Sequence, residues 1–230
     1  MKKIQRPLGI GALVLLMIGM YLVIQAPADF QQGNSVRILF IHVPSAKMAL
    51  LTYIVLTISS IMFLWKRNET ADIIADAAAP VGAAFTAVTL ATGSIWGKPM
   101  WGTWWAWDAR LTSMLVLLII YMGLMALRNA MDDPQKGARA TAVLAIIGAV
   151  DLPIIHFSVT WWRTLHQPPS FQGSKGGIHI AGPLLTPLLV MAVAFILLGA
   201  YLVTLKSREV AAQRDLAAKD ADAAMEELHD

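Results

Sequence analysis

The most distinctive stretch of the sequence is Trp96-Gly97-Lys98-Pro99-Met100-Trp101-Gly102-Thr103-Trp104-Trp105-Ala106-Trp107-Asp108-Ala109-Arg110. It contains five of the eight tryptophans and lies between two long apolar runs. Each of its three charged residues would cost roughly 2.5–3.5 kcal/mol at the centre of a bilayer. Its proline and two glycines also disfavour a continuous helix. We therefore expect a loop that lies on the membrane surface.

The tryptophans of this stretch have two interpretations. Trp prefers the headgroup region of a bilayer, so the indoles can simply anchor the loop. Alternatively, if residues 101–108 form a short helix, Trp101, Trp104, Trp105 and Asp108 share one face of it. Such a face would make a flat apolar shelf with a carboxylate at its edge. Composition alone leaves both interpretations open.

The composition of the chain is that of a membrane protein. Of its 230 residues, 57% are hydrophobic and only 14% are charged, whereas soluble domains carry about 25% charged residues. We expect an all-α polytopic membrane protein with one helical bundle. There is no cysteine, which excludes disulfides, thiolate metal sites and thioether-linked haem on this chain.

Apolar runs of spanning length predict a six-helix transmembrane bundle, with spans at residues 8–24, 45–65, 74–95, 111–127, 140–162 and 183–205. They form a single domain over residues 1–205, followed by a charged tail at 206–230 that is either a helical extension or disordered. Ala26-Pro27-Ala28 imitates a signal-peptide cleavage site. We expect the first span to be retained as an anchor, because the apolar region is long and Pro27 lies within that site.

The distribution of basic residues predicts the orientation. Six spans place both termini on one side, which carries twelve Lys and Arg residues against six on the other. By the positive-inside rule, both termini are cytoplasmic and the tryptophan-rich surface loop is periplasmic. The same rule explains the net charge of +3 without a nucleic-acid partner. No internal repeat supports an inverted-repeat transporter.

Two histidines at the outer side are candidate metal ligands. His42 precedes the second span and His156 lies in the last turns of the fifth, so both lie at similar depth near the tryptophans. Paired imidazoles fill both axial positions of haem iron, indoles cover the macrocycle, and Arg37 and Arg110 are candidates for binding its propionates. A histidine at a span end also commonly makes an interfacial hydrogen bond. Zinc fits less well, because no further carboxylate or thiolate is spaced to join them.

Three other ionisable residues receive no assigned role. Asp151 lies just before Pro153 and either caps backbone groups at a kink or supports a ligand. His166 and His179 lie in a loop rich in Pro, Gly and Ser. We expect both to be solvated rather than to bind a metal.

One motif resembles the signature of the WWD haem-handling membrane proteins: Trp101-Gly102-Thr103-Trp104-Trp105-Ala106-Trp107-Asp108-Ala109-Arg110-Leu111-Thr112. The histidine contexts are similar to those of its smallest branch, the haem exporter-type cytochrome c maturation protein C (CcmC) family. These contexts are Ile41-His42-Val43-Pro44 and Leu152-Pro153-Ile154-Ile155-His156. The resemblance covers about residues 27–205, with the WWD loop at about 96–112.

The resemblance implies a function. Such proteins bind haem b, as a transported ligand, at the periplasmic face of the bacterial inner membrane and deliver it to the membrane-anchored haem chaperone CcmE during cytochrome c biogenesis. The implied partners are the ABC-type subunits CcmA and CcmB and the small single-span CcmD. His42 and His156 match the axial ligands. The surface for haem and chaperone comprises Trp101, Gly102, Trp104, Trp105, Trp107 and Asp108.

The chain carries no Walker-type loop, so ATP hydrolysis would belong to a partner. We expect no catalysis beyond the handover of haem. Three other functions remain open. A b-type bis-histidine electron-transfer subunit would hold haem within the bundle, with ligands at two depths for transfer across the bilayer. A solute channel or transporter would need no haem. A haem lyase of the same superfamily would be longer, with more spans and histidines.

Overall fold

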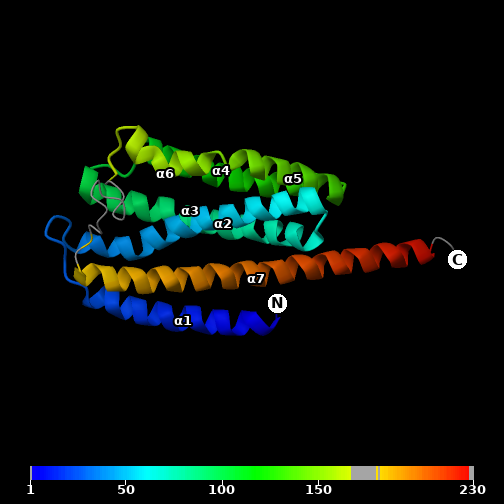
Figure 1. The fold of residues 1–230 in the computed structure, drawn as a ribbon, viewed down its shortest axis with the longest axis horizontal. Coiled ribbons are helices and arrows are strands. Elements are labelled where there is room, and N and C mark those ends of the chain that lie inside the picture. The colour runs from blue at the N-terminus through cyan, green and yellow to red at the C-terminus, as the bar shows by residue number, and fades with distance from the viewer. Residues whose placement is uncertain (1, 167–179, 181, 228–230) are drawn as a thin grey trace.

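The computed structural model describes residues 2–166, 180 and 182–227. In this part of the chain six segments are long and apolar enough to span a membrane, and the regular elements are helical (Figure 1). The predicted all-α, six-span fold is therefore confirmed. The elements are α1 (Lys2–Gln25), the 3-10 helix η1 (Asn34–Ile38), α2 (Leu39–Lys66), α3 (Glu69–Trp101), α4 (Ala109–Asn129), α5 (Pro134–Gly148), α6 (Asp151–Trp161) and α7 (Gly182–Glu227).

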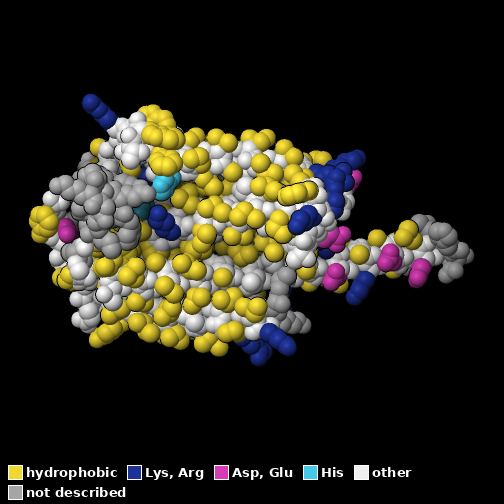
Figure 2. All heavy atoms as spheres, viewed as in Figure 1, with side chains coloured by type: hydrophobic (Ala, Val, Ile, Leu, Met, Phe, Trp, Pro, Cys, Tyr) yellow, Lys and Arg dark blue, Asp and Glu magenta, His cyan; other side chains and the backbone are white. Residues whose placement is uncertain are grey.

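The helices run along one direction and form two groups (Figure 1). Helices α2 to α6 pack together, while α1 packs mainly on α7, which in turn contacts α2 and α3. Both termini lie at one end of the bundle, here called the terminal end. The tryptophan end is the opposite one, where residues 26–38, 96–108 and 162–166 lie. A surface dominated by hydrophobic side chains separates the two ends, with Lys and Arg gathered at the terminal end (Figure 2).

Two buried tyrosines connect neighbouring helices at the centre of the bundle. Tyr53 and Tyr121 are fully buried, and their rings meet edge to face at 5.1 Å. The Tyr53 hydroxyl donates to the carbonyl of Ala145 (3.1 Å) and that of Tyr121 to the carbonyl of Ala49 (2.9 Å). Gly82 makes room for Tyr121, because a Cβ there would collide with its ring. Both hydroxyl groups are thus hydrogen-bonded within the protein, which matters because lipid offers no hydrogen-bond partners.

The tryptophan stretch differs from the predicted surface loop. Its first six residues belong to α3, which continues through Gly97 and Pro99 to Trp101. A helix in a membrane satisfies its own backbone, and this outweighs the intrinsic penalties of about 1 kcal/mol for Gly and about 3 kcal/mol for Pro. Gly102 ends α3 with φ 77°. Residues 102–108 form bends and irregular backbone, so the short helix on which the shelf interpretation depended is not formed.

Two other helix boundaries also differ from the sequence-based expectation. Helix α2 begins at Leu39 rather than near residue 45, so His42 and Pro44 lie inside it. The fifth span consists of two helices, with a break at residues 149–150 between α5 and α6. Pro153 is the third residue of α6, where its missing N–H removes no helical hydrogen bond.

The charged tail is a helical extension as far as the structure describes it. Helix α7 runs without interruption from Gly182 to Glu227. Beyond the expected end of the membrane span, the guanidinium of Arg214 contacts the carboxylates of Asp72 at 2.8 Å and Asp76 at 3.3 Å. The extension is therefore attached to the start of α3.

Candidate functional site

A cavity of about 310 Å³ opens at the tryptophan end, at the lower end of the size range of small-molecule sites. Its walls come from α2, α3, α4, α6, α7 and the segment after α6, and are mostly apolar. The polar groups that converge on it include three imidazoles and two cations: His42, His156, His166, Lys47 and Arg110. No Asp or Glu lines it among the described residues.

His42 is oriented by a hydrogen bond to α3. Its Nδ1 lies 3.1 Å from the hydroxyl oxygen of Thr92, and that hydroxyl donates to the carbonyl of Val88 at 2.7 Å. Because the single hydroxyl proton is used, Nδ1–H of His42 donates and Nε2 keeps its lone pair. Gly93 gives the ring its space, since a Cβ there would lie 3.1 Å from Cε1. Trp96 packs edge-on at 5.7 Å.

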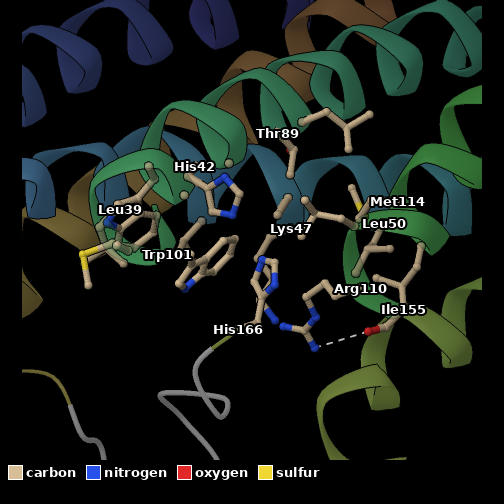
Figure 3. Close-up of a pocket in the computed structure, with 18 of the residues that line it drawn as sticks. Leu39, His42, Lys47, Leu50, Thr89, Trp101, Arg110, Met114, Ile155 and His166 are labelled. Carbon is tan, nitrogen blue, oxygen red and sulfur yellow. Dashed lines mark hydrogen bonds between the residues drawn. The ribbon is translucent and has the colours of Figure 1, made fainter. Parts of the chain in front are cut away.

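His166 shares the cavity with His42. Figure 3 shows both rings directed into the same space beside Trp101, whose ring centroid lies 4.9 Å from that of His166. Nδ1 of His166 lies 3.2 Å from Oδ2 of Asp108. A carboxylate only accepts, so Nδ1–H donates and the lone pair is again on Nε2. The expectation that His166 is solvated is wrong, because only 17% of its side chain is exposed.

Burial also favours the neutral form of His166. It lowers the pKa of this imidazole below its ordinary value, and nearby Arg110 acts in the same direction. The hydrogen bond and charge of Asp108 oppose this effect without cancelling it. At neutral pH the ring is therefore a neutral imidazole with a free nitrogen, which is the form that binds metals.

Asp108 connects the start of α4 to the segment that carries His166. Its Oδ1 accepts the N–H of Leu111 at 2.8 Å as the N-cap of α4, while Oδ2 also faces the N–H of Leu165 at 3.3 Å. The side chain is only 7% exposed and does not line the cavity. Asp108 therefore positions the residues around the cavity.

His156 lines the cavity but differs from the other two imidazoles. It is exposed, and its ring meets Phe157 edge to face at 4.7 Å. Within the described residues, no hydrogen bond to a ring nitrogen fixes its orientation. His42 and His166 thus share a ring orientation fixed by a hydrogen bond, which His156 lacks.

The two arginines predicted to bind an anionic ligand have different positions. Arg110 lines the cavity and holds α6 against α4, through Ser158 Oγ (3.0 Å) and the carbonyls of Ile155 and His156 (3.2 Å each); Figure 3 draws the bond to Ile155. Arg37 instead bonds two backbone carbonyls at the end of α1, at 3.3 Å each. It does not line the cavity.

The tryptophans divide between cavity and surface. Trp101 lines the cavity, whereas the side chains of Trp104 and Trp107 are exposed, at 57% and 77%. Trp105 packs edge-on against Trp107 at 5.4 Å. Of the predicted site residues, four line the cavity: His42, His156, Trp101 and Arg110. The other six do not: Arg37, Gly102, Trp104, Trp105, Trp107 and Asp108.

Five polar or aromatic residues of the cavity were not among the predicted site residues: Gln32, Lys47, Thr89, Trp96 and His166. Trp96 Nε1 donates to Gln32 Oε1 at 3.0 Å. This hydrogen bond connects α3 to the loop that precedes η1. One feature of the sequence could have indicated that His166 lies near the cavity. It follows the end of α6 by only five residues. His179, also expected to be solvated, lies outside the described residues.

Comparisons with known proteins show which family the chain belongs to. The profile of the heme exporter protein C (CcmC) family matches residues 1–222. Proteins named "Heme exporter protein C" are similar in Bradyrhizobium diazoefficiens (54% identity over 191 residues, 83% of this chain and 72% of that protein) and Escherichia coli K12 (47% over 186 residues, 80% and 74%). A "Putative cytochrome c biosynthesis ccmC-like mitochondrial protein" of Marchantia polymorpha is 44% identical over 185 residues (80% and 78%).

The molecule is thus a multi-pass membrane protein of the haem-handling class, which serves cytochrome c maturation. Within that class, the chain belongs to the heme exporter protein C (CcmC) family.

Proposed function

We propose that the cavity binds haem between His42 and His166 and that the protein delivers this haem to the chaperone CcmE. The proposal rests on the observation that the two imidazoles have the same hydrogen-bonding pattern. Each donates Nδ1–H to a fixed oxygen, of Thr92 or of Asp108, and each keeps a free Nε2 at the same cavity. Such outer hydrogen bonds are the usual means by which proteins orient histidine ligands.

The rest of the lining supports an anionic and largely apolar ligand. Indole rings of Trp96 and Trp101 border the cavity and offer faces and edges for a macrocycle. Arg110 and Lys47 supply positive charge, and no lining carboxylate among the described residues opposes it. His156 stays a candidate ligand from the sequence. Its exposed position at the cavity also suits a transient contact during entry or release.

Delivery to a partner is supported by the exposed tryptophans. Trp104 and Trp107 lie at the same end of the molecule as the cavity and present large apolar surfaces, the kind of side chain that is enriched in protein interfaces. We propose that they form part of the surface for CcmE. We also propose that the chain works with CcmA, CcmB and CcmD in the bacterial inner membrane, with haem b as the ligand and the tryptophan end in the periplasm.

The test is the haem spectrum of single alanine variants purified in detergent. We expect His42→Ala and His166→Ala each to abolish the bis-histidine spectrum and to lower the bound haem several-fold. His156→Ala is the matched comparison, because it removes a third imidazole of the same cavity, and it should keep the spectrum. CcmE loading should follow the bound haem.

The opposite pattern would contradict the ligand assignment. If His156→Ala loses the bis-histidine spectrum while His166→Ala keeps it, His156 is the partner of His42, as the sequence resemblance implied. If all three variants bind haem and load CcmE like the wild type, the cavity is not the haem site.

A further inference from the structure

We propose that Lys47 binds a carboxylate of the ligand in this cavity, so that the protein selects a tetrapyrrole with free propionates. The inference rests on the proposed function and adds a residue that determines specificity. Lys47 lies in α2, five residues after His42 and eight after the start of the helix, which places it about 12 Å along the helix axis. Its side chain lines the cavity together with Arg110 (Figure 3).

The position of Lys47 is unusual for a cation. It lies within a segment that is apolar enough to span the membrane. Ionisable residues at membrane depth are costly and usually pair with an opposite charge or serve a function. Figure 2 shows Lys or Arg side chains beside His on a surface that is otherwise largely hydrophobic. We therefore expect the ammonium group of Lys47 to have an anionic partner.

The described part of the protein does not supply that anion. Lys47 has no ion pair or hydrogen bond there, and no acidic residue lines the cavity. Residues 167–179 contain no Asp or Glu either. Asp29 accepts two backbone N–H groups of its own turn, and both oxygens of Asp108 are in use. Asp151 is buried and forms no ion pair within the described residues. The missing anion is thus best supplied by a ligand.

Lys47 and Arg110 are suited to different tasks. Three hydrogen bonds hold the Arg110 guanidinium against α6, although its Nη1 has no partner in the described residues. Lys47 has a flexible four-carbon stem and three donors, and it is exposed at the cavity. It can therefore follow a carboxylate as the ligand enters or leaves, while Arg110 stays in place. Haem carries two propionates on one edge, which matches two cations.

The competing explanation is that Lys47 extends toward the membrane surface and contacts lipid phosphates, as long cationic side chains commonly do. In that case Lys47 would not sense the carboxylates of a bound ligand. The two explanations differ in one observable, which is the dependence of binding on free propionates.

The experiment compares haem with haem dimethyl ester, in which both propionates are neutral. The full-length protein in lipid nanodiscs is titrated with each compound, and the Soret band reports binding. The variants are Lys47→Leu, Lys47→Arg and, as a matched control on the same helix, Lys66→Leu at the terminal end. We expect Lys47→Leu to weaken haem binding about tenfold or more, the usual effect of losing a charged hydrogen bond.

The same variant should bind the dimethyl ester like the wild type. Lys47→Arg should restore most of the affinity for haem, and Lys66→Leu should change neither ligand. Equal haem affinity of the wild type and Lys47→Leu would overturn the inference, as would an equal loss for haem and its ester. These results leave the proposed function intact. A different result would contradict the proposed function: the absence of a bis-histidine haem spectrum in the wild-type protein.

Discussion

At the scale of single residues, one carboxylate outside the cavity controls much of its geometry. Asp108 caps α4 through one oxygen and holds His166 through the other. The two tasks place different demands on the side chain. An asparagine caps a helix about as well as an aspartate, but its amide carries only one acceptor oxygen.

The first prediction concerns Asp108→Asn. If the amide oxygen caps α4, the amide N–H₂ faces Nδ1–H of His166, and two donors oppose each other. We expect thermal stability close to that of the wild type, with haem binding weakened about tenfold and an altered axial-ligand spectrum. Thermal unfolding and Soret titration measure the two effects.

Asp133→Asn is the matched control, since Asp133 caps α5 through the N–H groups of Gln135 and Lys136, far along the chain from the cavity. It should change neither property. If Asp108→Asn lowers stability and leaves the haem spectrum intact, the contact with His166 plays no part in binding.

Site residues could be predicted from the sequence only where a residue of suitable chemistry stands in a distinctive motif next to a membrane span. His42, Trp101 and Arg110 were selected because each stands in a distinctive motif beside a span, and each lines the cavity. His166 was not selected, because a histidine after a span in a polar loop has the ordinary features of a solvated residue. Its position beside the cavity depends on the contact with Asp108, 58 residues away, which local sequence does not reveal.

At the scale of elements, a cluster of charges joins three helices at the terminal end. Arg128 of α4 binds both oxygens of Asp72 in α3, at 2.9 and 2.7 Å, and contacts Asp76 at 3.1 Å. Arg214 of α7 adds its contacts to the same two carboxylates. The Asp72 side chain is only 6% exposed, so it depends on these partners.

The second prediction compares the two arginines. Arg128→Ala removes the two-pronged contact to a buried carboxylate, and we expect a loss of stability of about 3–5 kcal/mol. Arg214→Ala leaves Arg128 in place, so it should cost about 1 kcal/mol or less. Denaturation of the purified protein in mixed micelles measures both. A larger loss for Arg214→Ala than for Arg128→Ala would mean that the α7 extension, rather than α4, secures Asp72.

Helix existence was easier to predict than helix ends. All six spans follow from apolar runs, because lipid requires continuous backbone hydrogen bonding. The continuation of α3 through Gly97 and Pro99 did not follow, because intrinsic propensity disfavours it and the membrane overrides that propensity. The break between α5 and α6 is a further case, since both halves form one apolar run and Pro153 lies in the first turn of α6 instead of bending a continuous helix.

At the scale of the whole molecule, the orientation in the membrane remains a prediction from the basic residues. The absence of cysteine makes it easy to test, because any introduced thiol is the only one. We expect Asn34→Cys, at the tryptophan end, to react with a membrane-impermeant maleimide in intact spheroplasts. Thr70→Cys, at the terminal end, should react only after permeabilisation. Both positions are exposed.

The reverse labelling pattern would place the tryptophan end in the cytoplasm and would exclude periplasmic delivery. Labelling of both positions in intact spheroplasts would show that the membrane barrier was lost, so cytoplasmic marker release is measured in the same samples.

Helix α7 connects the cavity to the terminal end of the molecule. It has 46 residues and is about 69 Å long. Near its beginning, Leu188 forms part of the cavity wall. About 39 Å further along its axis, Arg214 contacts Asp72 and Asp76, and the helix continues to Glu227. One helix therefore joins the wall of the cavity to the charged cluster on α3 and α4.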